Sequence, residues 1–391
     1  MRPKKILLRI GIILIAFFCC NLNLKAEDVQ VQKEEVLEYG MNLFDWSVIG
    51  ELENKLKAEA PQLNQFHLKE AMTKLMSGQA DLSLDNILRQ IGHLFLGEIG
   101  LFLKLGARFL LIVILCNLLQ TLSSAFKSKD TIKVSFFVCY MAILLSVIQS
   151  FVAVIQIAHQ TIDQMLQVMY ICIPALLAFM STTGYAVSAA AMAPVIITGL
   201  SLATYVIKVL VLPCIIWVIV LEVVSSMSEE FKVDQFIKLF YKGIKWALRG
   251  ILILSIGILS IYRLTLPLAD MTVKRAALKF STAFIPVVGN AVSGVAEFLM
   301  GCSGLLKNTF SAGVIIWLLI LVSIPLIKIF SYVVVYQVAG AVIEPLGDKK
   351  MATVAHKLGR GCEFIMSAVG IVALLCVCSL AICMSVGFNV T

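Results

Sequence analysis

Four ionisable side chains stand in or beside long apolar segments, where a charge is expensive to bury. Lys208 joins two apolar runs, Glu222 lies near the end of one, and Lys328 and Glu344 flank a further polar stretch. The polar residues between the last two are Tyr332, Tyr336 and Gln337. Such residues could line a polar pathway or form a contact between subunits. For Lys208 and Glu222, the alternative is a place at the membrane interface, with the charged group reaching the lipid headgroups.

Cysteine and histidine form no recognisable metal site in this sequence. The chain has 11 cysteines and 4 histidines, and the cysteines beyond residue 26 stand in or beside apolar segments without a CxxC pair. Free cysteine packs as a small hydrophobe. The sequence also lacks a Walker phosphate loop, a GxSxG elbow and an HExxH helix. We therefore predict no cofactor, no metal and no enzymatic activity, and an intramembrane enzyme is the weakest class of function.

The elements that must position these residues are membrane-spanning helices. Of the 391 residues, 60% are apolar and only 14% are charged, whereas a typical soluble domain is about 25% charged. This composition excludes a soluble enzyme, a disordered regulator and a disulfide-rich secreted module. Apolar runs of about 20 residues are clearest at 101–122, 134–157, 209–226, 247–266, 312–330 and 364–387. The sequence predicts an all-α polytopic membrane protein with about seven or eight spans.

The first 95 residues differ from the rest of the chain. Residues 1–26 have a basic start, an apolar run and a small residue, Ala26, at their end, which is typical of a signal peptide. A retained signal anchor is the alternative. Residues 27–95 contain 12 acidic and 6 basic residues, with apolar positions at helical spacing. We expect a small extracytoplasmic helical domain over 27–95 and a polytopic membrane domain over 96–391.

Basic loops predict the direction of the spans, because Lys and Arg concentrate on the cytoplasmic side. The lysines after 101–122 and those within 228–249 predict two cytoplasmic segments, whereas 158–167 has no Lys or Arg and is expected to be an outside loop. Residues 168–207 must then cross an even number of times, as a tight hairpin or, given Pro174 and Pro194, as a pair of broken, re-entrant helices. Within 228–249, lysines alternate with aromatic residues, which favours an interfacial helix over a solvated loop.

The second half of the chain follows the charge rule less closely. Residues 268–280 are expected outside although they carry three basic residues, and 348–360 is expected in the cytoplasm. The glycine-rich stretch 284–304 predicts an amphipathic or re-entrant pair of helices. The net charge of +8 is divided into short groups between apolar spans. This distribution argues against a nucleic-acid partner and for contact with membrane lipids.

The order of these features resembles the stage III sporulation protein AE family. The stretch VKRAALK at 273–279, followed by FIPVVG at 284–289, looks like the most recognisable part of that family, and EPLGD at 344–348 resembles its second landmark. The residues of these motifs that we single out are Lys274, Arg275, Lys279, Pro286, Gly289, Pro345, Gly347 and Asp348. The likeness covers nearly the whole chain. The motifs carry no catalytic chemistry.

The resemblance implies an integral membrane subunit of a channel or secretion-like complex between mother cell and forespore, required for endospore formation and late forespore gene expression. It places the chain in the mother-cell membrane around the forespore. Its implied partners are other subunits of the conduit, among them a separate ATPase and ring-forming extracytoplasmic proteins. The competing hypothesis is a self-sufficient secondary transporter for a small molecule, using Lys208, Glu222, Lys328 and Glu344.

Two physical roles follow for the motif residues. Pro286 and Gly289 would break a helix in the membrane-associated stretch. Lys274, Arg275 and Lys279 would anchor the approach to it at lipid phosphates. The alternative for all of these residues is that they only mark the ends of helices and have no further role.

Overall fold

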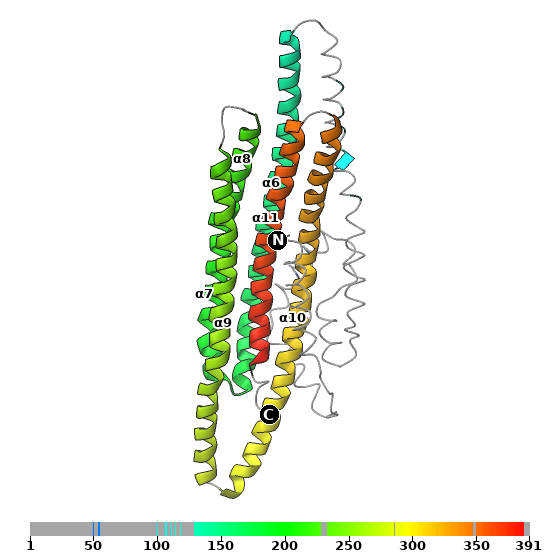
Figure 1. The fold of residues 1–391 in the computed structure, drawn as a ribbon. Coiled ribbons are helices and arrows are strands. Elements are labelled where there is room, and N and C mark those ends of the chain that lie inside the picture. The colour runs from blue at the N-terminus through cyan, green and yellow to red at the C-terminus, as the bar shows by residue number, and fades with distance from the viewer. Residues whose placement is uncertain are drawn as a thin grey trace. The chain divides into compact units, whose positions relative to one another are not determined.

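The described part of the chain is helical in a computed structural model (Figure 1). It comprises residues 129–227, 233–284, 286–346 and 349–386, with isolated positions between 50 and 118. All of these residues belong to the compact unit Leu43–Thr391. Apart from the isolated positions, the predicted signal peptide, the predicted domain at 27–95 and the predicted span 101–122 lie outside the described residues.

Long helices account for nearly all of this part of the chain. They are α6 (Lys129–Thr182), α7 (Ala186–Val206), the π-helix η2 (Ile207–Val211), α8 (Leu212–Met227), α9 (Asp234–Phe284), α10 (Pro286–Ile343), the 3-10 turn η3 (Glu344–Leu346) and α11 (Lys349–Ser385). Because α7, η2 and α8 follow one another directly, we call residues 186–227 the α7–α8 helix.

Five helical segments in the described part are long and apolar enough to cross a membrane. They are Ile148–Thr182, Ala186–Ser225, Gln235–Val273, Ser303–Ile343 and Ala352–Ser385. In the described part of the chain, the all-α prediction is confirmed, and these apolar helices support the predicted membrane protein. The predicted total of seven or eight spans remains a prediction, because part of the chain lies outside the described residues.

Successive helices run in alternating directions (Figure 1). The helix bundle therefore has two opposite ends, and buried polar contacts lie at each of them. At one end, Glu222 of α8 meets Tyr241 of α9. At the other end, Asp270 of α9 meets Ser188 of α7. We call these the α8–α9 end and the α6–α7 end.

The predicted loop at 158–167 is wrong, because α6 runs through it without interruption. Exposed polar residues recur along one face of this helix: Gln156, Gln160, Asp163 and Gln167 are all exposed, whereas the intervening Ile162 and Met165 are buried. The polarity that suggested a loop therefore marks a face. For the same reason 134–157 is part of α6, and 209–226 is continuous with the helix that begins at Ala186.

The turn between α6 and α7 selects the hairpin over the re-entrant alternative for 168–207. The N–H of Gly184 donates to the Ser181 carbonyl at 3.1 Å, and the N–H of Tyr185 donates to the Met180 carbonyl at 3.0 Å. This pair of bonds is the Schellman motif that ends a helix with a left-handed residue. Gly184 supplies that residue, with a φ of 81°.

The prolines expected to break these helices lie inside them. α6 passes through Pro174 and α7 passes through Pro194. The irregularity comes at η2, which ends two residues before Pro213. Proline has no N–H and its ring crowds the carbonyl four residues earlier, and a π-helical turn is one way for a helix to absorb that disruption.

Two further segments differ from the sequence-based expectation. The predicted interfacial helix within 228–249 is the beginning of α9, which continues for 51 residues. The predicted helix pair at 284–304 is the junction between two long helices: α9 ends at Phe284 and α10 begins at Pro286. The helix boundary therefore falls before Pro286, and α10 runs on through Gly289.

The core forms around α10, the most buried of the five candidate spans, while α9 is the most exposed. Trp317 and Tyr336 of α10 are each 1% exposed and are among the largest fully buried side chains. α11 packs closely through glycine: a Cβ on Gly361 would lie 2.1 Å from Cδ1 of Ile219 on α8. Of the six cysteines whose side chains the structure describes, four are buried, as expected for packing residues: Cys172, Cys362, Cys376 and Cys383.

Candidate functional site

Glu222 forms the centre of a buried polar contact at the α8–α9 end. The side chain is 3% exposed, and the Tyr241 hydroxyl donates to its carboxylate at 2.7 Å. The Tyr241 ring stacks on Phe364 of α11, with ring centroids 4.8 Å apart. A charge in the apolar interior is stable only when it is paired or hydrogen-bonded. Glu222 thus joins three helices instead of lying free at the membrane interface.

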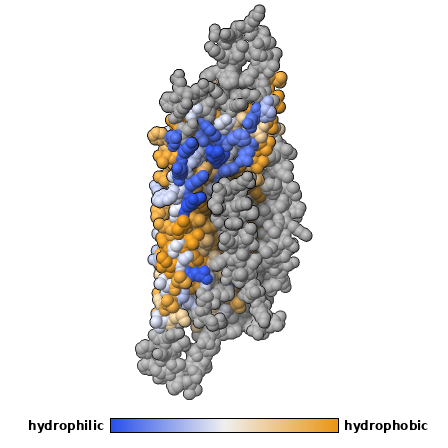
Figure 2. All heavy atoms as spheres, viewed as in Figure 1, coloured by the Kyte–Doolittle hydropathy of each residue, from blue (hydrophilic) through white to orange (hydrophobic). Residues whose placement is uncertain are grey.

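Basic residues surround this contact. The Lys357 ammonium lies 3.5 Å from the backbone carbonyl of Glu222, and the Lys245 ammonium lies 5.5 Å from the centroid of the Phe364 ring. On the neighbouring α10, the Gln337 amide donates to Glu363 at 2.6 Å. Figure 2 shows hydrophilic residues gathered toward the end where α10 ends and α11 begins, with hydrophobic residues further along the described surface. The distribution fits the cytoplasmic side that the basic residues predict.

Lys208 makes an ion pair with a residue that the sequence did not single out. Its ammonium lies 2.6 Å from a carboxylate oxygen of Asp163 on α6. The side chains are 26% and 50% exposed, so the pair faces outward from the described helices. Lys208 sits in η2, and π-helical turns occur frequently at functional sites.

Asp270 binds the first N–H groups of the α7–α8 helix, at its other end. This α9 residue is 2% exposed and accepts hydrogen bonds from the N–H groups of Val187 and Ser188 at 2.9 and 3.0 Å, and one from the Ser188 hydroxyl. Tyr185, at the cap position of α7, makes no side-chain cap bond. Asp270 therefore caps α7 from another helix. Burial, and secondarily the Asp270 charge, raise the pKa of the Tyr185 hydroxyl above its ordinary value.

Lys307 is a second buried charge at the α6–α7 end. It is 3% exposed, and its ammonium donates to the Val386 carbonyl, just beyond the last residue of α11. A cation at a helix C-terminus satisfies a free carbonyl and complements the helix dipole. Lys307 thus ties α10 to the end of α11.

Lys328 and Glu344 do not come together. Both belong to the continuous segment formed by α10 and η3, 16 positions apart, which corresponds to about 24 Å along a helix. Lys328 is partly buried and Glu344 is exposed. Between them, Tyr336 shares a hydrogen bond with Ser150 of α6. The polar stretch therefore contributes to helix packing, and the direct Lys328–Glu344 contact is not formed.

The motif residues lie near helix ends. Lys274, Arg275 and Lys279 belong to the last part of α9, and Pro286 is the first residue of α10. Gly289 lies inside α10, and Pro345 is an exposed residue of η3. Gly347 and Asp348 lie outside the described residues.

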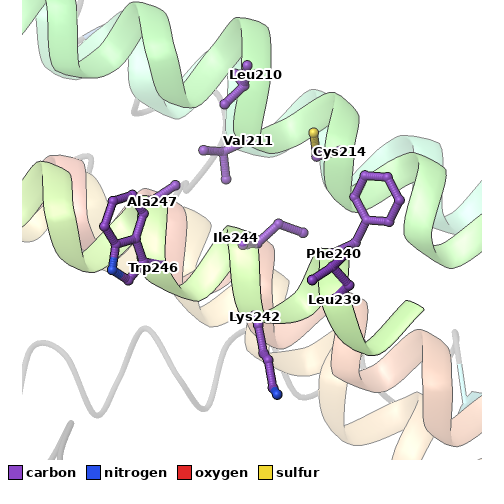
Figure 3. A pocket seen from close by; sticks show the side chains of 10 residues that line it. Leu210, Val211, Cys214, Leu239, Phe240, Lys242, Ile244, Trp246 and Ala247 are labelled. Atoms are coloured by element: carbon purple, nitrogen blue, oxygen red, sulfur yellow. The ribbon is translucent and has the colours of Figure 1, made fainter. Parts of the chain in front are cut away.

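An apolar pocket of about 590 Å³ lies between the α7–α8 helix and the first turns of α9 (Figure 3). Val211 and Cys214 line one side, and Phe240 and Trp246 line the other. Lys242 extends from α9 away from η2 and α8 (Figure 3). The apolar lining suits a lipid acyl chain and offers few groups that could orient a polar substrate. In the part of the chain that the structure describes, no three His, Cys, Asp or Glu side chains are placed to hold a metal ion.

Sequence reasoning did not single out Asp163, Asp270 and Lys307. Asp163 was hidden by the assumption of a loop, although its spacing from Gln156, Gln160 and Gln167 is helical. Asp270 and Lys307 gave no local signal, because their partners are 82 and 79 positions away in the chain.

A family model described as Stage III sporulation protein AE matches residues 66–387. That range covers most of the chain and all five candidate spans. The chain belongs to the Stage III sporulation protein AE family.

Membership of the family extends beyond its motifs. The Stage III sporulation protein AE of Bacillus subtilis (strain 168) is 28% identical to this chain over 363 residues, which are 93% of the chain and 91% of that protein. No solved structure matches the chain. The buried contacts of Glu222, Asp270 and Lys307 all fall within the range that the family model matches.

Proposed function

We propose that this protein is an integral membrane subunit of a conduit that operates between mother cell and forespore during endospore formation. The family match over residues 66–387 carries the proposal. The five candidate spans add the membrane location that a conduit subunit needs. In this proposal the chain lies in the mother-cell membrane around the forespore, is made with a signal peptide, and places residues 27–95 in the space between the two membranes.

The arrangement of the helices favours a subunit over a self-sufficient transporter. Secondary transporters bind their substrate near the middle of the membrane, between helices that are often interrupted there. Here the middle of the described helices is filled by α10, with Trp317 and Leu318 buried. The four residues that a transporter would use are also dispersed. Lys208 faces outward, Glu222 is bonded to Tyr241, and Lys328 and Glu344 are far apart along one helix.

We propose that the protein acts by assembly and has no enzymatic activity of its own. Its partners would be other subunits of the conduit, including a separate ATPase and ring-forming proteins outside the cytoplasm. Its exposed lysines and aromatic residues at the start of α9, such as Lys242 and Trp246, would hold the α8–α9 end among lipid headgroups.

Deletion of the gene in the organism that carries it tests the proposal. The expected result is unchanged vegetative growth with a loss of heat-resistant spores of several orders of magnitude, restored by the wild-type gene. Normal spore counts in the deletion strain would contradict a role in sporulation.

Co-purification separates the two classes of function. An affinity-tagged chain, extracted in mild detergent from sporulating cells, is expected to bring further membrane and extracytoplasmic subunits with it in fixed ratio. A tagged chain that restores sporulation and yet purifies alone would favour the transporter.

A further inference from the structure

Polar side chains follow one side of α6 and the adjoining side of the α7–α8 helix. The members from α6 are Gln156, Gln160, Asp163, Gln167 and Tyr170, and those from the α7–α8 helix are Thr198, Ser201, Tyr205 and Lys208. In both helices the spacing alternates between three and four residues, which places each set on one face. We call these nine residues the α6–α7 polar face.

The two sets form one continuous surface. The Tyr170 and Ser201 hydroxyls share a hydrogen bond of 2.8 Å, and the Lys208 ammonium bonds to Asp163 at 2.6 Å. Seven of the nine residues are exposed, while Ser201 and Lys208 are partly exposed. The side-chain amides of Gln156, Gln160 and Gln167 make no hydrogen bond within the described part of the chain.

The polar face lies at membrane depth. Ser188 and Glu222, bonded to Asp270 and Tyr241, mark the two polar ends of the α7–α8 helix and are 34 positions apart. That is about 51 Å of helix, whereas about 20 residues cross the hydrocarbon. Every 20-residue segment between Ser188 and Glu222 contains residues 203–207. Tyr205 is therefore inside the hydrocarbon layer, and Ser201 and Lys208 lie within one helical turn of that common segment.

Lipid is an unsuitable neighbour for this surface. Hydrocarbon offers no hydrogen bonds to amides and hydroxyls and no solvation to an ion pair. The α7–α8 helix shows the contrast, because Leu210 is 55% exposed and lies two positions from Lys208, which places it on a different side of the helix. Helix α9 likewise exposes Ile253, Leu254 and Ile261. The described helices therefore have separate apolar surfaces for lipid and one polar surface that requires another environment.

Water fits the polar face better than a tightly packed protein surface does. A protein covering it would have to supply partners for three glutamine amides and desolvate an ion pair whose carboxylate side chain is 50% exposed. Both requirements are demanding, because buried polar groups without partners and desolvated charges are strongly unfavourable. Water hydrogen-bonds to all of these groups without a matched geometry.

We propose that the α6–α7 polar face is one wall of a water-filled passage across the membrane, with the other walls supplied by neighbouring chains of the assembly. The wall contains one carboxylate and one ammonium in contact, together with amides and hydroxyls, so it carries no net charge. Such a wall suits hydrophilic solutes of either sign. The neighbouring chains rest on the proposed function, whereas contact of the face with water is measured separately.

Accessibility of single introduced cysteines tests the passage in its native setting. Gln160→Cys and Gln167→Cys place a thiol on the polar face, and Ile253→Cys is the control on the exposed apolar surface of α9. Membranes from sporulating cells that make each full-length variant are treated with membrane-impermeant methanethiosulfonates, one cationic and one anionic. Labelling is counted above that of the wild-type chain, which measures the native cysteines. Reaction after solubilisation and the heat-resistant spore count show that each variant is intact.

Both polar-face variants are expected to react roughly tenfold faster or more than Ile253→Cys, because the reactive thiolate forms readily only in water. The cationic and anionic reagents are expected to react at similar rates. Labelling of Gln160→Cys and Gln167→Cys as slow as the control would overturn the proposal. So would disulfide-linked dimers through Gln160→Cys without reagent labelling, because they would place a second copy on this face. Labelling as expected in cells whose deletion strain still forms spores would contradict the proposed function and leave the aqueous face standing.

Discussion

The cap that Asp270 places on α7 makes a quantitative prediction. Its buried carboxylate accepts hydrogen bonds from two backbone N–H groups, on Val187 and Ser188, and one from the Ser188 hydroxyl. Asp270→Asn keeps one acceptor oxygen but turns an NH₂ group toward the other donors. Hydrogen bonds to charged groups are worth about 1.5–3 kcal/mol each. We therefore expect the variant to lose about 1.5–3 kcal/mol of folding free energy.

The stability loss is measured on the purified full-length chain in mild detergent. Titration with dodecyl sulfate, followed through tryptophan fluorescence, reports the packing around the buried Trp317. Asp163→Asn is the matched control, because it makes the same chemical change in an exposed ion pair, and such pairs contribute about 0–1 kcal/mol. Ser188→Ala removes only the hydroxyl bond and is expected to fall between the two. Equal stability of Asp270→Asn and Asp163→Asn would refute the capping argument.

Two further substitutions test the packing of the helices. Gly361→Ala is expected to destabilise the fold by about 1–3 kcal/mol, because the new Cβ meets Ile219 in a filled core. In the control Gly257→Ala, the new Cβ has nothing within 4 Å. This control should be neutral or up to about 1 kcal/mol stabilising. Equal effects in the same detergent titration would contradict the close approach. Tyr241→Phe is expected to lose about 1–3 kcal/mol, because it removes the hydrogen bond from Tyr241 to the Glu222 carboxylate. A double-mutant cycle with Glu222→Gln that shows no coupling would count against this bond.

The helical class and the hairpin could be predicted from local features. Long apolar runs force the backbone to satisfy its hydrogen bonds within each segment, so they specify helices directly. Thr183 and Gly184 end α6 because glycine adopts the left-handed conformation without strain. These features depend on residues close in sequence, and the sequence shows them plainly.

The lengths and contacts of the helices could not be predicted in the same way. The polar residues around Asp163 were interpreted as a loop, because low hydropathy was taken as the end of a span when it marks one face of α6. Pro174 and Pro194 suggested breaks, yet packed neighbouring helices allow α6 and α7 to pass through them. Asp270 and Lys307 are defined by partners about 80 positions away. Contacts of that kind arise only when the helices have packed.

Transport by the purified chain separates a conduit subunit from a self-sufficient transporter most directly. The full-length chain alone and the assembly co-purified from sporulating cells are reconstituted in liposomes that contain a small hydrophilic dye. A conduit subunit on its own is expected to release no more dye than empty liposomes, whereas the assembly is expected to release it. Saturable solute flux through the chain alone would contradict the account.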